Sequence, residues 1–247
     1  MSRPYQPIIL IGPARSGTKI MRDTIATHPS IAKVGFDINF IWKRFNEGMS
    51  HDALEAEQAT DKVQRYIRKY FAKQAEGKPF VIEKTVSNTL RIPFVLRAFP
   101  DAKFIFLYRD GRDAVESVVR QWGVAPDNSY LVKKFLSVPF FDVLPYVIKY
   151  AIDLLRIKLN LTTTSSYVWG GIYPGFEKDL DEKDTLEFCA IQWNKCVEAM
   201  LRDAHLVQKQ SMIVHYEAFI ENTAQTVESI ANFLDLEADQ FDISKIN

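Results

Sequence analysis

The chain has 247 residues, of which 47% are hydrophobic and 25% are charged, and its 31 basic and 31 acidic side chains give a net charge of zero. This length and composition predict one large globular domain, or a domain with insertions. Balanced charge excludes the overall basic field of nucleic-acid-binding proteins, so any anion site must be local. The chain opens without an apolar leader, and no uncharged run is long enough to cross a membrane. We therefore expect a cytoplasmic protein without a transmembrane segment.

Short apolar runs alternate with helical patterns along the chain. The runs have the length of buried strands, and this alternation indicates βαβ units. The expected fold class is therefore α/β, with a central parallel sheet of about five strands flanked by helices. A long helical stretch at about 129–160 is expected to be an insertion into a single domain, residues 1–247. The predicted strands are 8–11, 32–34, 80–82, 103–108 and 212–215, and the predicted helices are 19–27, 39–48, 52–75, 88–98, 112–121, 131–159, 182–209 and 223–234.

The loop between the first strand and the first helix has the sequence GPARSGTK, residues 12–19. A strand, a glycine-containing turn and a helix start form a phosphate cradle in this order, because backbone N–H groups and the positive end of the helix dipole face the anion. The loop nearly matches the nucleotide P-loop, but Thr18 precedes Lys19, so the hydroxyl that would bind magnesium is displaced. Arg15 lies inside the loop instead. This combination predicts an anion bound without a metal; the alternative is an ordinary turn in which Gly17 relieves strain.

A second motif, FIFLYRDGRDAVES, includes the predicted strand 103–108. It delivers Arg109 to the end of a buried strand and places Ser117 on the helix that follows. Ligands of open α/β sheets bind at the carboxyl ends of the strands, where an arginine fork and a serine hydroxyl suit a phosphate. The alternative is a salt-bridged Arg-Asp turn without a ligand.

Asp37, Lys84 and Tyr216 each come shortly after another predicted strand. Taken singly, Asp37 could be a helix N-cap, Lys84 could belong to a surface ion pair, and Tyr216 could be a ring packed at the sheet edge. Together with Arg15 and Arg109, they would lie at one edge of one parallel sheet. This shared edge predicts a single site.

These motifs resemble those of the sulfotransferases that use 3′-phosphoadenosine 5′-phosphosulfate (PAPS). GPARSGTK looks like the family's 5′-phosphosulfate loop, and FIFLYRDGRDAVES looks like its 3′-phosphate motif. The resemblance runs from about residue 7 to residue 240 and implies a P-loop-like three-layer fold. HPSIAKVGFDINF is similar to the segment that carries the family's acidic general base. The segments FPDAKFIFLYRD, VWGGIYPG, CAIQWNKCVEAM and IVHYEAFIENTAQTVESIANFLDLE are similar to the bacterial and Golgi-type branch, which includes carbohydrate and tyrosylprotein sulfotransferases.

The resemblance implies an enzyme that transfers a sulfuryl group from PAPS to an acceptor hydroxyl of a carbohydrate, lipid, metabolite or tyrosine. The product would be 3′-phosphoadenosine 5′-phosphate (PAP), and no metal would be needed. Asp37 matches the position of the general base, and Lys84 matches a lysine that stabilises the leaving phosphate. Arg15 would hold the transferring sulfuryl group. The implied nucleotide contacts are Ser16, Gly17, Thr18 and Lys19 to the 5′-phosphosulfate, Arg109 and Ser117 to the 3′-phosphate, and Tyr216 to the nucleotide.

The sequence departs from the family pattern in two places. Asp37 is one methylene shorter than the glutamate that this branch usually has. The chain ends at Asn247, before the segment that closes over the nucleotide in the family, so we expect that segment to be absent.

Two other functions remain as alternatives. A P-loop kinase or NTPase is disfavoured by the order of Thr18 and Lys19, and by the Tyr-Arg-Asp sequence where a Walker B acid would follow the strand 103–108. A non-catalytic nucleotide-binding protein of the same fold would be compatible with aspartate at position 37 and with the missing segment.

Overall fold

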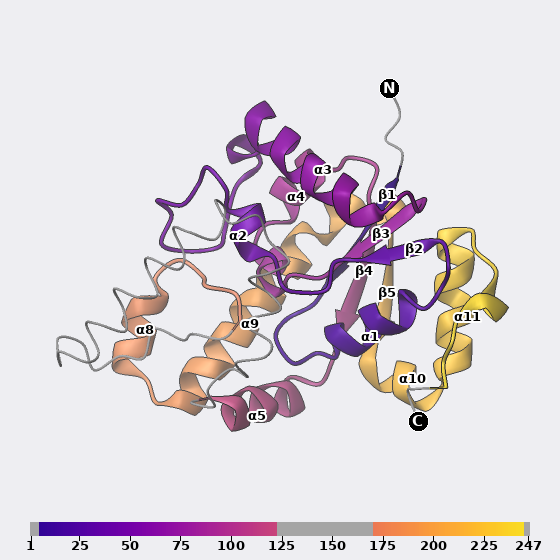
Figure 1. Cartoon of the computed structure of the whole chain (residues 1–247). Helices are drawn as coiled ribbons and strands as arrows, with labels where there is room; N and C mark the ends of the chain where they lie inside the picture. Colours follow the sequence, from indigo (N-terminus) through magenta and orange to yellow (C-terminus); the bar gives the residue numbers. More distant parts are fainter. Residues whose placement is uncertain (1–4, 123–169, 245–247) are drawn as a thin grey trace, which may run out of the picture. The chain divides into compact units, whose positions relative to one another are not determined.

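The computed structural model describes residues 5–122 and 170–244, which carry the sequence colours in Figure 1. Within these ranges, five strands form one sheet in the order β2-β3-β1-β4-β5, and every neighbouring pair is parallel. The prediction of a parallel sheet of about five strands is confirmed. The strands are β1 (Gln6–Ile11), β2 (Ile31–Lys33), β3 (Phe80–Glu83), β4 (Lys103–Tyr108) and β5 (Ser211–His215).

Strand β1 lies at the centre of the sheet, between β3 and β4. Ile8 is opposite Ile82 of β3, and Ile9 is opposite Phe104 of β4. Because all strands run the same way, their carboxyl ends meet at one edge. The loop after β1 therefore starts between the strand ends that lead to Lys84 and Arg109.

Side chains of β1 alternate between two cores, one on each face of the sheet. Ile9 and Ile11 pack with residues of α3 and α4, whereas Ile8 and Leu10 pack with residues of α1 and α11. This alternation is the period of an extended strand and gives the predicted three layers (Figure 1). The described α-helices are α1 (Thr18–Ile25), α2 (Asn39–Trp42), α3 (Asp61–Ala75), α4 (Ile92–Ala98), α5 (Gly111–Gln121), α8 (Phe176–Glu182), α9 (Thr185–Asp203), α10 (Tyr216–Glu221) and α11 (Thr223–Leu234).

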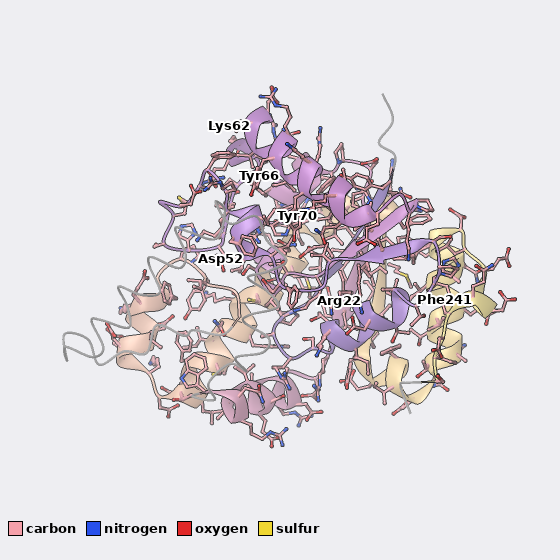
Figure 2. All side chains as sticks on the ribbon, in the orientation of Figure 1. Arg22, Asp52, Lys62, Tyr66, Tyr70 and Phe241 are labelled. Atoms are coloured by element: carbon pink, nitrogen blue, oxygen red, sulfur yellow. The ribbon has the colours of Figure 1, made fainter. Side chains whose placement is uncertain are left out.

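Two predicted helices are shorter than expected. The prediction at 52–75 is wrong for its first part, because α3 begins only at Asp61. Asp52 is buried, and its carboxylate accepts hydrogen bonds from Ser87 Oγ at 2.6 Å and from the backbone N–H of Ile172 at 3.0 Å (Figure 2). It therefore joins three loops instead of entering a helix. The predicted helix 39–48 ends early, and Phe45 has a left-handed φ of 70°.

The predicted helix 88–98 is divided at Arg91, whose φ of −147° is not helical. A 3₁₀ turn at Val86–Leu90 precedes the division, and α4 follows it with a proline in its first turn. The short helices α8 and α10 have no counterpart among the predicted elements. The insertion predicted at about 129–160 lies outside the described residues. None of the helices in the described ranges is both long and apolar enough to cross a membrane.

Candidate active site

The loop after β1 has an unusual backbone at two positions. Gly17 is the N-cap of α1 with a φ of 85°, and Arg15 has a φ of 63°. Left-handed backbone at Gly17 suits a residue without a Cβ, whereas Arg15 holds this conformation as a non-glycine residue. Backbone N–H groups at the start of α1 have no carbonyl partner in the helix. The predicted order of strand, loop and helix start is confirmed, and the anion site at this loop stays a prediction.

Tyr216, at the start of α10, packs directly on this loop. A Cβ built on Gly17 would lie 2.2 Å from Cδ2 of the Tyr216 ring, so a larger residue would require the ring or the loop to shift. Tyr216 also carries the Arg109 guanidinium over its ring, with Cζ at 4.6 Å from the ring centroid. The ring therefore joins the loop after β1 to the end of β4.

Arg109, Arg15 and Ser117 form a hydrogen-bonded set. Arg109 donates from Nη1 to the backbone carbonyl of Arg15 at 2.8 Å, and Arg15 donates from Nε to Ser117 Oγ at 2.9 Å. Ser117 lies on α5, with 8% of its surface exposed. The two sequence motifs are thus in direct contact through their predicted ligand-binding residues.

The Arg-Asp sequence after β4 contains both a salt-bridged turn and a site residue. Arg112 pairs with Asp110 at 2.8 Å, and this hydrogen-bonded partner lowers the pKa of the exposed Asp110 carboxyl to about 2. Arg109 takes no part in that pair and is directed to the Arg15 carbonyl. The salt-bridged turn therefore accounts for Asp110 and Arg112, not for Arg109.

Several polar groups at the loop are available for a ligand. Ser16 is fully buried, and its hydroxyl has no hydrogen-bond partner among residues 5–122 and 170–244; the same holds for Nε of Arg109. Thr18 is buried at the first position of α1, and Lys19 is exposed beside it. Buried donors without partners are costly unless a ligand or water satisfies them. Hydroxyl, guanidinium and ammonium donors on a helix N-terminus fit the oxygens of a phosphate or sulfate.

Asp37 and Lys84 form the second part of the site. Oδ2 of Asp37 lies 3.9 Å from Nζ of Lys84 and accepts the backbone N–H of Val86 at 3.2 Å, while Oδ1 accepts the backbone N–H of Asn39 at 3.3 Å. The side chain of Asp37 is 29% exposed and that of Lys84 is 15% exposed. The carboxylate is therefore fixed by the loops after β2 and β3 while part of it still reaches solvent. The alternative of a helix N-cap is wrong, because the N-cap of α2 is Ile38 and has no side-chain cap; Asp37 instead accepts two loop amides and pairs with the lysine.

Glu83 is the polar residue whose position the sequence analysis did not foresee. The Glu83 carboxyl does not form a surface ion pair with Lys84, because Glu83 is fully buried at the end of β3. Its Oε1 accepts the hydroxyl of Thr85, and its Oε2 accepts Nδ2 of Asn88 at 3.0 Å. Burial raises the pKa of the Glu83 carboxyl to about 7. An acid as the last residue of an otherwise apolar strand is the sequence signal that points to such a group.

The predicted site residues therefore fall into two groups at the same sheet edge. One group lies around the loop after β1 and contains Arg15, Gly17, Arg109, Ser117 and Tyr216. The other is the Asp37–Lys84 pair. The parallel sheet places both groups beyond the carboxyl ends of its strands.

Comparisons with known proteins agree with this geometry. A family described as "Sulfotransferase family" matches residues 7–138. Protein-tyrosine sulfotransferase 1 of Homo sapiens is 30% identical over 126 residues, which cover 46% of this chain and 34% of that protein. Protein-tyrosine sulfotransferase 1 of Danio rerio is 22% identical over 245 residues, which cover 93% of this chain and 53% of that protein. The chain thus spans about a third to a half of the length of these two relatives.

Solved structures show the same fold. A sulfotransferase from Alicyclobacillus acidocaldarius matches with a TM-score of 0.53 and 17% identity, covering 99% of this chain and 86% of that one. The sulfotransferase domain from the curacin biosynthetic pathway matches with a TM-score of 0.55 and 15% identity, covering 96% of this chain and 76% of that one. These likenesses confirm the P-loop-like three-layer fold. The family match covers more than half of the chain and includes both motifs predicted to bind phosphate, and the chain therefore belongs to the sulfotransferase family.

Proposed function

We propose that this chain transfers a sulfuryl group from PAPS to an acceptor hydroxyl. The observation that carries the proposal is the contact between the two motifs: Arg109 holds the backbone of Arg15, and the Arg15 side chain holds Ser117. PAPS carries phosphate groups at two positions. The loop after β1 and the Arg109–Ser117 pair lie close enough together to bind one group each.

The residues present fit such a donor. Ser16, Gly17, Thr18 and Lys19 would bind the 5′-phosphosulfate through the loop backbone, the hydroxyls and the ammonium group. Arg109 and Ser117 would bind the 3′-phosphate, and Tyr216 would contact the nucleotide. The buried hydroxyl of Ser16 and Nε of Arg109, which lack partners in the described ranges, support this assignment.

The catalytic roles follow from charge and position. When bound, PAPS supplies the sulfuryl group and a phosphate leaving group. Asp37 would accept the proton of the acceptor hydroxyl, as a general base must, and its part-exposed carboxylate can be reached by one. Arg15, Lys19 and Lys84 supply positive charge near the oxygens where negative charge accumulates in an in-line displacement.

A tyrosine hydroxyl in a peptide is the acceptor that we propose to test first. The relatives from Homo sapiens and Danio rerio are both protein-tyrosine sulfotransferases, and a phenol is one of the hydroxyls that the sequence analysis allowed. An oligosaccharide and 4-nitrophenol complete the panel, because a carbohydrate and a small metabolite are the other acceptor classes that can be presented in solution.

Two measurements test the proposal. The first is the melting temperature with PAP and, separately, with ATP and magnesium, because a ligand that binds only the native state raises it. The second is transfer of sulfur-35 from labelled PAPS to each acceptor of the panel. Stabilisation by PAP and label transfer support a sulfotransferase. Stabilisation by ATP and magnesium alone would favour a kinase or NTPase, and PAP binding without any transfer would favour a non-catalytic nucleotide-binding protein.

A further inference from the structure

A chain of hydrogen bonds runs from the buried Glu83 to the backbone beside Asp37. The carboxylate of Glu83 accepts the hydroxyl of Thr85, and Oγ1 of Thr85 in turn accepts the backbone N–H of Ile38 at 3.1 Å. Glu83 is 0% exposed and Thr85 is 1% exposed, so water does not compete for these bonds. These hydrogen bonds end at the backbone amide of Ile38, the residue that follows Asp37.

This chain joins the two loops that carry the candidate catalytic pair. Lys84 lies between Glu83 and Thr85 in the sequence, so both of its neighbours are fixed by the same contacts. On the other side, the carboxylate of Asp37 accepts the backbone N–H of Val86. The loop after β3 therefore holds the loop after β2 at two adjacent points, the amide of Ile38 and the carboxylate of Asp37.

We propose that Glu83 and Thr85 are positioning residues that set the geometry of the Asp37–Lys84 pair, an inference that rests on the proposed sulfotransferase function. Neither needs to touch the substrate. Glu83 orients the Thr85 hydroxyl, Thr85 fixes the backbone at Ile38, and that backbone fixes Asp37. A displacement of about 1 Å in a catalytic group can lower a rate by about 10²-fold, so this support matters for turnover.

The hydrogen-bond partners of Glu83 favour its ionised form. Thr85 donates to one carboxylate oxygen and Asn88 donates Nδ2–H to the other. The amide of Asn88 is fixed in this orientation because its Oδ1 accepts Nε of Arg91 at 2.8 Å. Only the ionised carboxylate accepts both bonds at once. A proton on Oε1 would be donated to the Thr85 hydroxyl, which would turn its own proton away, although Oγ1 could still accept the Ile38 N–H.

Titratable groups from several elements surround Glu83. Asp37, in the loop after β2, disfavours the ionised form, whereas Lys84 and Arg91 favour it. Tyr70 of α3, labelled in Figure 2, also faces this carboxyl, and burial and Glu83 together raise the Tyr70 pKa to about 12, so the phenol stays neutral. With burial added, the pKa of Glu83 rises to about 7. Protonation of Glu83, and with it a change in the orientation of the Thr85 hydroxyl, therefore falls within the pH range of an ordinary assay.

The first test replaces the hydroxyl of Thr85. Thr85→Val keeps the shape but removes the hydrogen bonds, and we expect kcat to fall at least about tenfold, with the PAP dissociation constant within about twofold of wild type. Thr85→Ser restores the hydroxyl and should recover most of kcat. The matched control is Thr89→Val in the same 3₁₀ turn, because the buried Thr89 hydroxyl donates to the Val86 carbonyl at 2.8 Å and not toward Ile38. Equal kcat values for Thr85→Val and Thr89→Val would overturn the proposal.

The second test uses pH, which a purely structural contact would not reveal. In wild type, kcat should fall as pH decreases through about 7, because protonated Glu83 no longer accepts the Thr85 hydroxyl, which must then reorient. Glu83→Gln should turn over slowly and lack this step, since its single amide oxygen cannot accept from both Thr85 and Asn88 at any pH. Adding Asn88→Asp to Glu83→Gln supplies an acceptor for the glutamine amide. The double variant should recover part of kcat without restoring the fall of kcat near pH 7. A pH profile of Glu83→Gln with the wild-type step retained would overturn the proposal.

The wild-type reaction separates the two possible failures. Both tests use PAPS and the acceptor of the panel that receives the label. A wild type that transfers no label to any acceptor refutes the sulfotransferase function, and the positioning role with it. An active wild type whose kcat is unaffected by Thr85→Val refutes the positioning role alone.

Discussion

Nε of Arg15 donates a hydrogen bond to Oγ of Ser117 at 2.9 Å, although 102 residues separate them in the sequence. Arg15 belongs to the loop after β1, and Ser117 belongs to the second turn of α5. Their contact makes one binding surface out of two motifs that the sequence shows apart. A change at either residue is therefore expected to affect both ends of a bound nucleotide, to different extents.

Arg15→Ala is expected to lower kcat by about 10²- to 10³-fold, the usual cost of one preorganised donor at a reacting oxyanion. The measurement is label transfer from PAPS at saturating donor. The matched control is Arg112→Ala, which removes an arginine that is 92% exposed and paired with Asp110. Equal kcat values for the two variants would remove Arg15 from the catalytic groups.

Arg109→Ala is expected to weaken PAP binding by about 10- to 100-fold, the loss of one charge-assisted hydrogen bond to phosphate. Ser117→Ala should weaken it less, because a neutral hydroxyl contributes a weaker bond. Titration calorimetry with PAP measures both. A dissociation constant for Arg109→Ala equal to that of wild type would show that the 3′-phosphate binds elsewhere.

Gly17→Ala is expected to destabilise the fold and to weaken PAP binding, because its Cβ would lie 2.2 Å from the Tyr216 ring. Gly77→Ala is the matched control: Gly77 has a φ of 81°, close to the 85° of Gly17, but no atom within 4 Å of an added Cβ. The control should lose only about 1 kcal/mol of unfolding free energy through backbone strain. Urea unfolding of the two variants therefore isolates the steric effect of Tyr216. Equal losses would mean that the ring moves aside at no cost.

Asp37→Asn is expected to lower kcat by about 10²-fold or more while leaving the PAP dissociation constant unchanged. Asparagine keeps one oxygen that can accept the Val86 N–H, the bond between the two loops, and loses the local bond from Asn39, so the loops should stay joined. Kinetics and calorimetry on the same preparation give both quantities. A fully active asparagine variant would exclude general-base catalysis by Asp37.

The buried Glu83 should also make stability depend on pH. Its pKa is raised from 4.5 to about 7 in the fold, so the folded protein binds the proton more tightly than the unfolded chain does. Its contribution to stability is therefore complete below about pH 4.5 and is lost as pH rises through about 7. Relative to Glu83→Gln, wild type should lose on the order of 3 kcal/mol between pH 4 and pH 8. Urea unfolding at both pH values measures this, and a difference that does not change with pH would contradict it.

Much of the fold and of the candidate site follows from local sequence patterns. The five strands are short apolar runs, and each candidate site residue follows a strand, so one parallel sheet is enough to bring Arg15, Asp37, Lys84, Arg109 and Tyr216 to one edge. The match of α11 to the predicted 223–234 reflects a clear helical period, which places Val227, Ile230, Ala231 and Leu234 on one buried face.

The remaining features depend on contacts that no local pattern reveals. Asp52 breaks the predicted helix 52–75 because Ser87 and Ile172 donate to it from distant parts of the chain. The role of Glu83 is hidden for the same reason, since a carboxyl beside a lysine reads as a surface pair until its burial is known. Likewise, the close fit of Tyr216 on Gly17 joins residues from opposite ends of the sequence.

The strand order also determines when this site can form during folding. The first two strands, β1 and β2, are not neighbours; both pair with β3, which begins at Phe80. An N-terminal fragment that ends before β3 contains the phosphate-binding loop but no pair of adjacent strands to hold it. Such non-local pairing is slow, because long loops must close before any contact compensates their entropy. The sheet edge that gathers the candidate site residues therefore begins to form only after the chain has extended past β3, and it is complete only with β5 and Tyr216.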